Sequence, residues 1–123
     1  VLRHADDARY FARSAQNACN VLDVAHPLWL TRAAGYRSKE VRGLAERLLS
    51  DALARWVDDQ GFGFHAAGDR ATPELQGTEM WLAIIWYIAD LRGTAHLLGY
   101  EARGVHGPEA AVGLSRPAPN SRR

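Results

Sequence analysis

The amino-acid sequence predicts an all-α protein, and three segments carry this prediction. Residues 80–89 form an unbroken apolar run, residues 17–30 form a second, nearly continuous one, and residues 38–59 place apolar side chains along one stripe at helical spacing. A helix that is apolar on every side must be surrounded by protein, whereas a one-sided helix covers a core from outside. The sequence therefore predicts two layers, with the two apolar helices inside and the amphipathic helix outside.

Start and stop signals frame the apolar run at 80–89. Thr72 can cap the start of the helix, Pro73 suits the first helical position, and Glu74 favours the positive end of the helix dipole. Gly93 is the expected stop. A membrane span needs roughly 20 apolar residues, so this shorter run is interpreted as a core helix.

The apolar segment at 17–30 contains one residue that disfavours a helix. Pro27 lacks a backbone donor and biases His26 away from helical geometry, so we expect a kink or break near His26. Gly35 is expected to end the segment, and residues 8–15 before it can form a further helix.

The amphipathic segment at 38–59 is expected to begin with Ser38 as its N-cap. On its charged face Arg47, Asp51 and Arg55 are four residues apart, so we expect them to pair along the surface. Its apolar stripe comprises Val41, Leu44, Ala45, Leu48, Ala52 and Trp56.

Length, charge and cysteine content narrow the class of protein. A chain of 123 residues forms about one small domain. Its 15 Lys and Arg against 14 Asp and Glu give a net charge of +1, which argues against nucleic acid or an anionic membrane as an obligate partner. Cys19 is the one cysteine, so we expect a reducing, cytoplasmic environment. Because the chain opens on Val1 rather than methionine, we expect it to be the C-terminal part of a longer protein.

The C-terminal part of the chain changes in composition. Residues 94–98 are expected to add a short helical turn, and the residues after 115 have no apolar side chain to anchor them. We therefore expect one domain of helical repeats over 1–113 and a disordered tail over 114–123.

An internal repeat is visible when Gln16 is aligned with Gln76. The apolar runs that follow then fall almost in step, and so do the closing glycines, Gly35 and Gly93. The repeated unit reads inner helix, outer helix, glycine-aromatic loop, inner helix. Such a unit cannot bury its apolar faces without neighbours.

The sequence Gln60-Gly61-Phe62-Gly63-Phe64, followed by a helix that opens Gln76-Gly77-Thr78, resembles the repeat of the terpenoid-cyclase and protein-prenyltransferase superfamily. More closely, residues 17–30 and 76–91 resemble the C-terminal end of bacterial prenyltransferase/squalene-oxidase-repeat proteins. The resemblance covers about residues 15–99 and implies part of an α/α toroid. It implies inner and outer helix layers around a central cavity, with about three main helices here and a short C-terminal turn.

The chain also departs from that superfamily. It lacks the Asp-x-Asp-Asp motif of the cyclases, and Asp58-Asp59 is interpreted as a solvated helix end. Cys19, Asp23 and His26 are residue types that bind zinc, but the spacing of the prenyltransferase ligands is not reproduced. We therefore expect neither a metal nor another cofactor.

Polar side chains within the two apolar helices are the candidate site. They would be costly to bury unless they paired or faced a wet cavity, such as the centre of a toroid. The catalytic candidates are Asp23, His26 and Glu79, and the ligand-binding candidates are Asn20, Gln76, Trp81 and Tyr87. The alternative is that the polar groups bond one helix to the other and that the tryptophans, Trp29, Trp56, Trp81 and Trp86, fill the interface between layers.

The favoured function is that of a C-terminal fragment of a prenyltransferase- or squalene-cyclase-like toroid protein, without autonomous activity. The alternative is a noncatalytic helical-repeat module that binds a hydrophobic ligand or a partner protein. The sequence leaves open whether the chain is an enzyme. The expected partners are the missing N-terminal repeats or a second copy of the chain, together with a hydrophobic small molecule. Neither nucleic acid nor a membrane span is expected.

Overall fold

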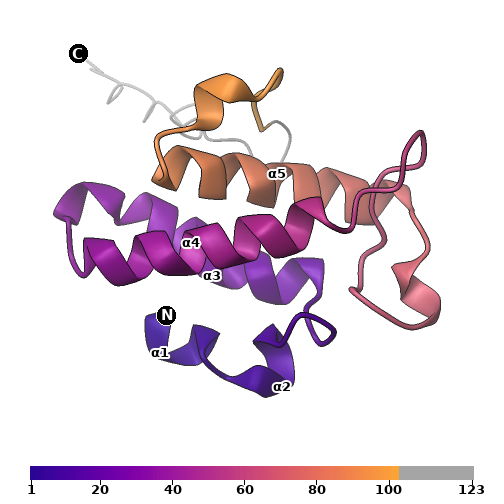
Figure 1. The fold of residues 1–123 in the computed structure, drawn as a ribbon, viewed down its shortest axis with the longest axis horizontal. Coiled ribbons are helices and arrows are strands. Elements are labelled where there is room, and N and C mark those ends of the chain that lie inside the picture. Colours follow the sequence, from indigo (N-terminus) through magenta and orange to yellow (C-terminus); the bar gives the residue numbers. More distant parts are fainter. Residues whose placement is uncertain (103–123) are drawn as a thin grey trace, which may run out of the picture.

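The computed structural model describes residues 1–102 and confirms the all-α class for them. Three long helices form the body: α3 (Ala18–Leu30), α4 (Ser38–Leu53) and α5 (Leu75–Leu91) (Figure 1). Two short helices precede them, α1 (Leu2–Ala5) and α2 (Ala8–Phe11), and 3₁₀ turns occur at Arg32–Ala34, Asp69–Ala71 and Ala95–Leu97. No β-strand occurs within residues 1–102, and none of their helices is long and apolar enough to cross a membrane.

The turn at Ala95–Leu97 agrees with the short turn predicted at 94–98. The predicted domain boundary after residue 113 and the predicted tail over 114–123 lie outside the described residues.

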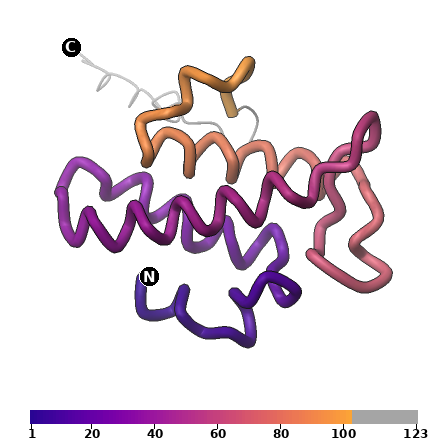
Figure 2. The backbone as a smooth tube through the Cα atoms, in the orientation of Figure 1, coloured from indigo at the N-terminus to yellow at the C-terminus, as the bar shows by residue number. Residues whose placement is uncertain are grey.

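Helices α3 and α5 run parallel, and α4 runs in the opposite direction (Figure 2). At the start of α3, the Ala18 N–H donates to the Phe64 carbonyl, 2.9 Å away, in the loop that leads into α5. At the other end, the Trp29 Nε1 of α3 donates to Asp90 of α5 at 2.7 Å. Both ends of the two helices therefore lie together, and α4 packs against α5 on the way back.

The three helices differ in how they are buried. The middle of α5, from Met80 to Ala89, is buried except on the side of Leu82 and Trp86, which are half-buried. Helix α4 buries a single stripe, as the sequence predicts. In α3, however, Cys19, Asp23 and Leu30 are exposed to solvent. One face of α3 is therefore open in this chain, although its sequence is nearly as apolar as that of α5.

Of the kink or break expected near His26, a break does not occur, since α3 continues through Pro27 to Leu30. Pro27 removes the donor for the carbonyl group of Asp23, one turn earlier. Asp23 lies on the exposed face, where water can bond that carbonyl group. After the proline, the Thr31 N–H and hydroxyl both donate to the Pro27 carbonyl, at 3.1 and 2.8 Å. The helix therefore tolerates the proline at a solvated position.

Two predicted helix caps are wrong by one or two residues. Ser38 is the first residue of α4, and Arg37 occupies the cap position without a side-chain cap bond. At α5, the cap position is Glu74, and the Thr72 hydroxyl bonds Asp69 instead. The Glu74 N–H donates to the Phe62 carbonyl at 3.0 Å, so a contact with a distant loop sets where α5 begins.

Helix α4 also ends earlier than predicted, at Leu53 rather than near residue 59. Residues 57–61 form a tight turn in which Val57 and Gly61 bond each other, and Asp59 and Gly61 have positive φ angles of 62° and 95°. Trp56 is consequently 47% exposed, which corrects the expectation that it fills the interface between layers. Asp58 and Asp59 are exposed, as the sequence predicts.

The glycine-aromatic loop, residues 61–64, packs tightly on the start of α5. Phe62 is 2% exposed and Phe64 8%, which confirms that they plug the core. The Thr78 hydroxyl accepts the Phe62 N–H at 3.0 Å and donates to the Phe62 carbonyl at 3.3 Å. Trp81 Nε1 donates to the Gly63 carbonyl at 3.0 Å, so the polar end of a fully buried indole is satisfied there.

The charged face of α4 binds the N-terminal segment rather than pairing along itself, which corrects the predicted pairing of Arg47, Asp51 and Arg55. Asp51 accepts a bond of 2.9 Å from the buried Gln16 amide, and Arg55 donates to the same amide at 2.6 Å. Arg47 donates to backbone carbonyls of Ala5 and Phe11. The Gln16 Nε2 also donates to the Phe11 carbonyl at 3.1 Å, so the buried amide, only 1% exposed, has partners for both its nitrogen and its oxygen.

We expect Gly77→Ala to destabilise the protein by about 1–3 kcal/mol, the usual range for overpacking a well-packed interior. A Cβ atom at Gly77 would lie 2.6 Å from the Phe64 nitrogen and 2.8 Å from the Phe62 oxygen. Both are backbone atoms, which cannot move aside by changing a rotamer. Denaturant unfolding followed by circular dichroism measures the change.

Gly43→Ala is the matched control, because Gly43 also lies in a helix but a Cβ there would have no atom within 4 Å. Alanine is the better helix former, so this substitution should stabilise the protein by about 0.5–1 kcal/mol. If both variants change the free energy of unfolding in the same direction, the close approach of the helix backbone at Gly77 to the loop backbone is not important for stability.

Candidate functional site

The predicted site residues of α3 lie along its open side. Asp23 is exposed, and Asn20 and His26 are half-buried. The His26 ring lies 5.1 Å from the ring of Tyr87 on α5. Of the residues predicted for the site, His26 and Tyr87 are therefore a pair that the fold brings together.

The predicted site residues of α5 point in different directions. Gln76 is exposed, and Glu79 lines a cavity of about 410 Å³ next to Tyr100. Trp81 and Tyr87 are fully buried, at 0% and 1% exposure. Trp81 contacts the glycine-aromatic loop, and Tyr87 contacts α3, so these two predicted ligand-binding residues belong to different interfaces.

Two tyrosines on this side of the fold have raised pKa values. Burial raises the pKa of the Tyr87 phenol and raises that of Tyr100 to about 12. The Tyr100 hydroxyl also donates to the Leu82 carbonyl of α5, at 2.8 Å. Both phenols therefore stay neutral near pH 7; Tyr87 packs against neighbouring rings, and Tyr100 packs and donates a hydrogen bond.

An aromatic cluster joins the C-terminal halves of α3 and α5. The Trp29 ring centroid lies 4.9 Å from that of Tyr87 and 5.9 Å from that of Trp86. Asp90 accepts the Trp29 Nε1 bond from the edge of this cluster and lies 3.5 Å from the Arg32 Nε. The cluster thus carries one carboxylate that bonds both an indole and a guanidinium group.

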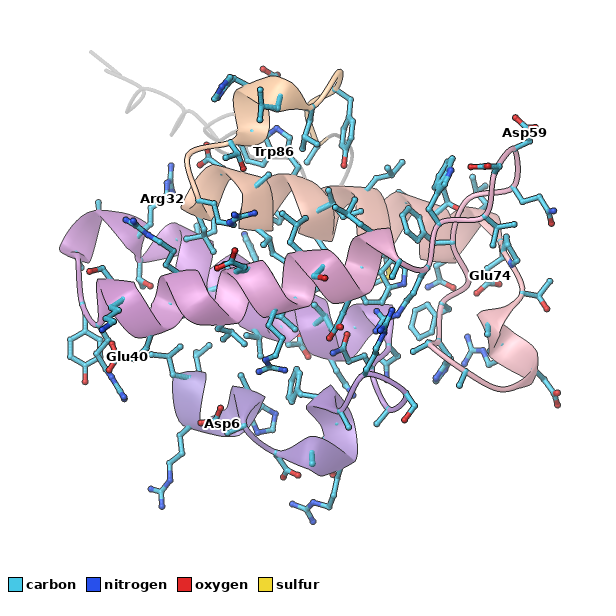
Figure 3. All side chains as sticks on the ribbon, viewed as in Figure 1. Asp6, Arg32, Glu40, Asp59, Glu74 and Trp86 are labelled. Atoms are coloured by element: carbon cyan, nitrogen blue, oxygen red, sulfur yellow. The ribbon has the colours of Figure 1, made fainter. Side chains whose placement is uncertain are left out.

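Arg32 is held in place by the same cluster (Figure 3). Its guanidinium carbon lies 4.0 Å above the Trp29 ring, and its Nη1 donates to the Trp29 carbonyl at 2.7 Å. A stacked guanidinium with a carboxylate partner is attracted by both the ring face and the charge. Arg32 is therefore fixed at the end of α3.

A cavity of about 670 Å³ lies at this end, where α3 turns back into α4. We call it the hairpin cavity. Its volume is within the 300–1,000 Å³ that is usual for small-molecule sites. Its apolar walls include Leu2, Leu28, Val41 and Leu91, with Tyr36 at the turn, and its charged side chains are Arg3, Arg32, Arg37 and Arg42. No Asp or Glu is among the described residues that line it.

The four arginines differ in how their charge is balanced. Arg32 faces Asp90, and Arg37 bonds the Glu40 carboxylate at 3.1 Å. Arg3 and Arg42 form no ion pair with any residue between 1 and 102. The described lining of the cavity therefore carries two cations without a carboxylate partner.

The N-terminus of α4 also lies at the cavity, since Arg37 and Ser38 line it. Arg37 occupies the cap position with a positive φ of 48°, which is uncommon for a residue with a side chain. The backbone N–H of Glu40 donates a hydrogen bond to the carboxylate of the same residue, and this bond holds the pKa of Glu40 below its usual value. The side chain of Arg37 adds to this effect. This helix end therefore favours a negative charge.

The hairpin cavity is not among the sites that the sequence predicts. The signal that could have found it is local, because residues 31–42 contain Arg32, Arg37, Lys39 and Arg42 against one acid, Glu40. The apolar walls could not be found in this way, since they come from α1, α3, α4 and α5.

Metal ligands are not gathered in the part of the chain that the structure describes. No group of three or more His, Cys, Asp or Glu side chains there is placed to hold a metal ion. Cys19, Asp23 and His26, the residue types considered for zinc, do not form such a group.

We expect Asp90→Ala to lower the free energy of unfolding by about 1–3 kcal/mol, because it leaves the buried Trp29 N–H without its acceptor. Glu46→Ala is the control, since Glu46 is 69% exposed and contacts Arg92 at 3.6 Å on the surface. The exposed ion pair of Glu46 and Arg92 should contribute less than about 1 kcal/mol to the free energy of unfolding. Denaturant unfolding measures both changes. If the two variants lose the same free energy of unfolding, the hydrogen bond between Trp29 and Asp90 does not stabilise the fold as proposed.

Comparison with known protein families, with characterised proteins and with solved structures finds no match to this chain. The functional interpretation therefore rests on the residues and the geometry described above.

Proposed function

We propose that this chain is a noncatalytic helical-repeat module that binds a hydrophobic ligand in the hairpin cavity. The observation that supports this proposal most directly is the cavity itself, with a volume of about 670 Å³ and apolar side chains in its walls. Pockets for small molecules are typically apolar concavities with a few polar groups that orient the ligand.

The three main helices each contribute to the apolar walls of the cavity. Leu28 comes from α3, Val41 from α4 and Leu91 from α5, so each main helix contributes one apolar side chain. Leu28 precedes Trp29 and Leu91 follows Asp90, and the hydrogen bond between Trp29 and Asp90 holds the two helix ends together.

We expect 1-octanol to bind the 123-residue chain saturably, with a Kd below about 1 mM, or roughly 4 kcal/mol of binding free energy. Amide chemical shifts in a ¹H–¹⁵N spectrum measure the binding. The largest changes should lie around Leu28, Val41 and Leu91, because these residues line the cavity.

Val41→Trp should fill the cavity and weaken octanol binding at least about tenfold. Leu53→Trp is the matched control on the same helix, since Leu53 is 53% exposed and does not line the cavity. Ala34→Trp, at an exposed lining residue, replaces the first variant if circular dichroism shows that Val41→Trp is unfolded. Octanol binding that is unaffected by filling the cavity would refute the proposal.

A second candidate function is that of repeats in a cyclase- or prenyltransferase-like α/α toroid. The specific observation in its favour is the direction of the helices, since α3 and α5 run parallel and α4 returns against α5. In this case α3 and α5 would be inner helices, with Asp23, His26 and Glu79 as catalytic residues. The partners would be further repeats or a second copy of the chain, packed on the open face of α3.

Light scattering and thermal unfolding of the purified chain test this second candidate. A toroid unit without its neighbours exposes apolar surface, so we expect it to associate or to melt without cooperativity. A monodisperse monomer with one cooperative transition would contradict the toroid candidate. It would leave ligand binding in the hairpin cavity unaffected.

A further inference from the structure

We propose that the ligand of the hairpin cavity is a single alkyl chain with an anionic head, a carboxylate or a phosphate, and that Arg3 and Arg42 bind this head. This inference rests on the proposed function, because it assigns the chemical class of the ligand for the same cavity. It is carried by the distribution of charge around the cavity.

The cavity separates apolar from charged groups. Leu28 and Leu91 are half-buried or buried at its walls, whereas Arg3 and Arg42 are exposed and therefore lie toward the solvent side. A ligand that satisfies both kinds of surface has an apolar body and a charged end. Free inorganic phosphate would leave the apolar walls uncovered, and an uncharged hydrocarbon would leave the arginines without a partner.

The charge of the head follows from the lining residues. Four arginines and no described carboxylate line the cavity. Asp90 and Glu40 lie beside the cavity and face Arg32 and Arg37. Asp6 lines an adjoining hollow with Arg3, but neither Arg3 nor Arg42 forms an ion pair with a described residue. Guanidinium groups bind carboxylate and phosphate oxygens in pairs of parallel hydrogen bonds, so an anionic head fits these two side chains.

The start of α4 adds a second source of attraction for an anion. The cap residue Arg37 provides no side-chain acceptor, and no described group accepts the backbone N–H of Ser38 or Lys39. Glu40 lies in the same first turn, and its depressed pKa indicates that negative charge is stabilised there. The Glu40 carboxylate is thus an internal competitor for the head of the ligand.

The first experiment compares ligands of equal chain length by isothermal titration with the 123-residue chain. At low ionic strength, octanoate or octyl phosphate should bind about tenfold more tightly than 1-octanol, and octylammonium should bind more weakly than the alcohol. Raising the salt from about 50 mM to about 500 mM should reduce this preference and leave octanol binding unchanged. Inorganic phosphate alone should not bind, and the tighter of the two anionic ligands identifies the head.

The second experiment uses charge variants. Arg42→Gln should weaken octanoate binding about three- to tenfold and leave octanol binding unchanged, because it removes a bond to the head alone. Arg70→Gln is the control, since it changes the net charge equally and lies in the loop before α5, where its guanidinium stacks on the Phe64 ring and does not line the cavity. Glu40→Gln should strengthen octanoate binding about two- to threefold, because it removes the competing carboxylate and frees Arg37.

The outcomes separate the two levels of the proposal. If octanol binds in the cavity but octanoate and octyl phosphate bind no more tightly, the anionic head is refuted and hydrophobic binding stands. If Arg42→Gln and Arg70→Gln weaken octanoate binding equally, Arg42 does not bind the anionic head. If none of the alkyl ligands binds, both the inference and the proposed function fail.

Discussion

The packing of the glycine-aromatic loop on the first turns of α5 is the contact on which the rest of the described structure depends. Gly77 lets the helix backbone approach the loop backbone directly, and Thr78 and Trp81 bond the loop from the same helix. The loop also receives the first N–H of α3 at the Phe64 carbonyl. Helices α3 and α5 therefore begin from one shared support, which makes them parallel and leaves α4 to connect their opposite ends.

The two helices are joined again at their far ends, and this second junction produces the candidate site. The bond between Trp29 and Asp90 is made by residues adjacent in sequence to Leu28 and Leu91, which line the hairpin cavity. The same carboxylate holds Arg32 at the end of α3. The position of the cavity therefore depends on how α3 and α5 are joined.

The sequence predicts what is local and misses what depends on contacts between distant segments. The helical periods and the plugging role of Phe62 and Phe64 follow from neighbouring residues, and the structure confirms them. The start of α5 and the partner of Asp51 depend on Phe62 and Gln16, which are far away in the chain. The hairpin cavity escaped prediction for the same reason, because its arginines are close in sequence but its apolar walls come from separate helices.

The three predicted catalytic side chains do not converge on one site among the described residues. General acid–base chemistry needs its groups within hydrogen-bonding reach of one reacting site, or one water away. Here Glu79 lines the cavity beside Tyr100, whereas His26 contacts Tyr87 and Trp29, and Asp23 is exposed. The proposed ligand binding and the proposed assembly would use different surfaces. A neighbouring repeat would pack on the side of α3, whereas the hairpin cavity is lined by residues at the helix ends around Gly35, so one proposal does not depend on the other.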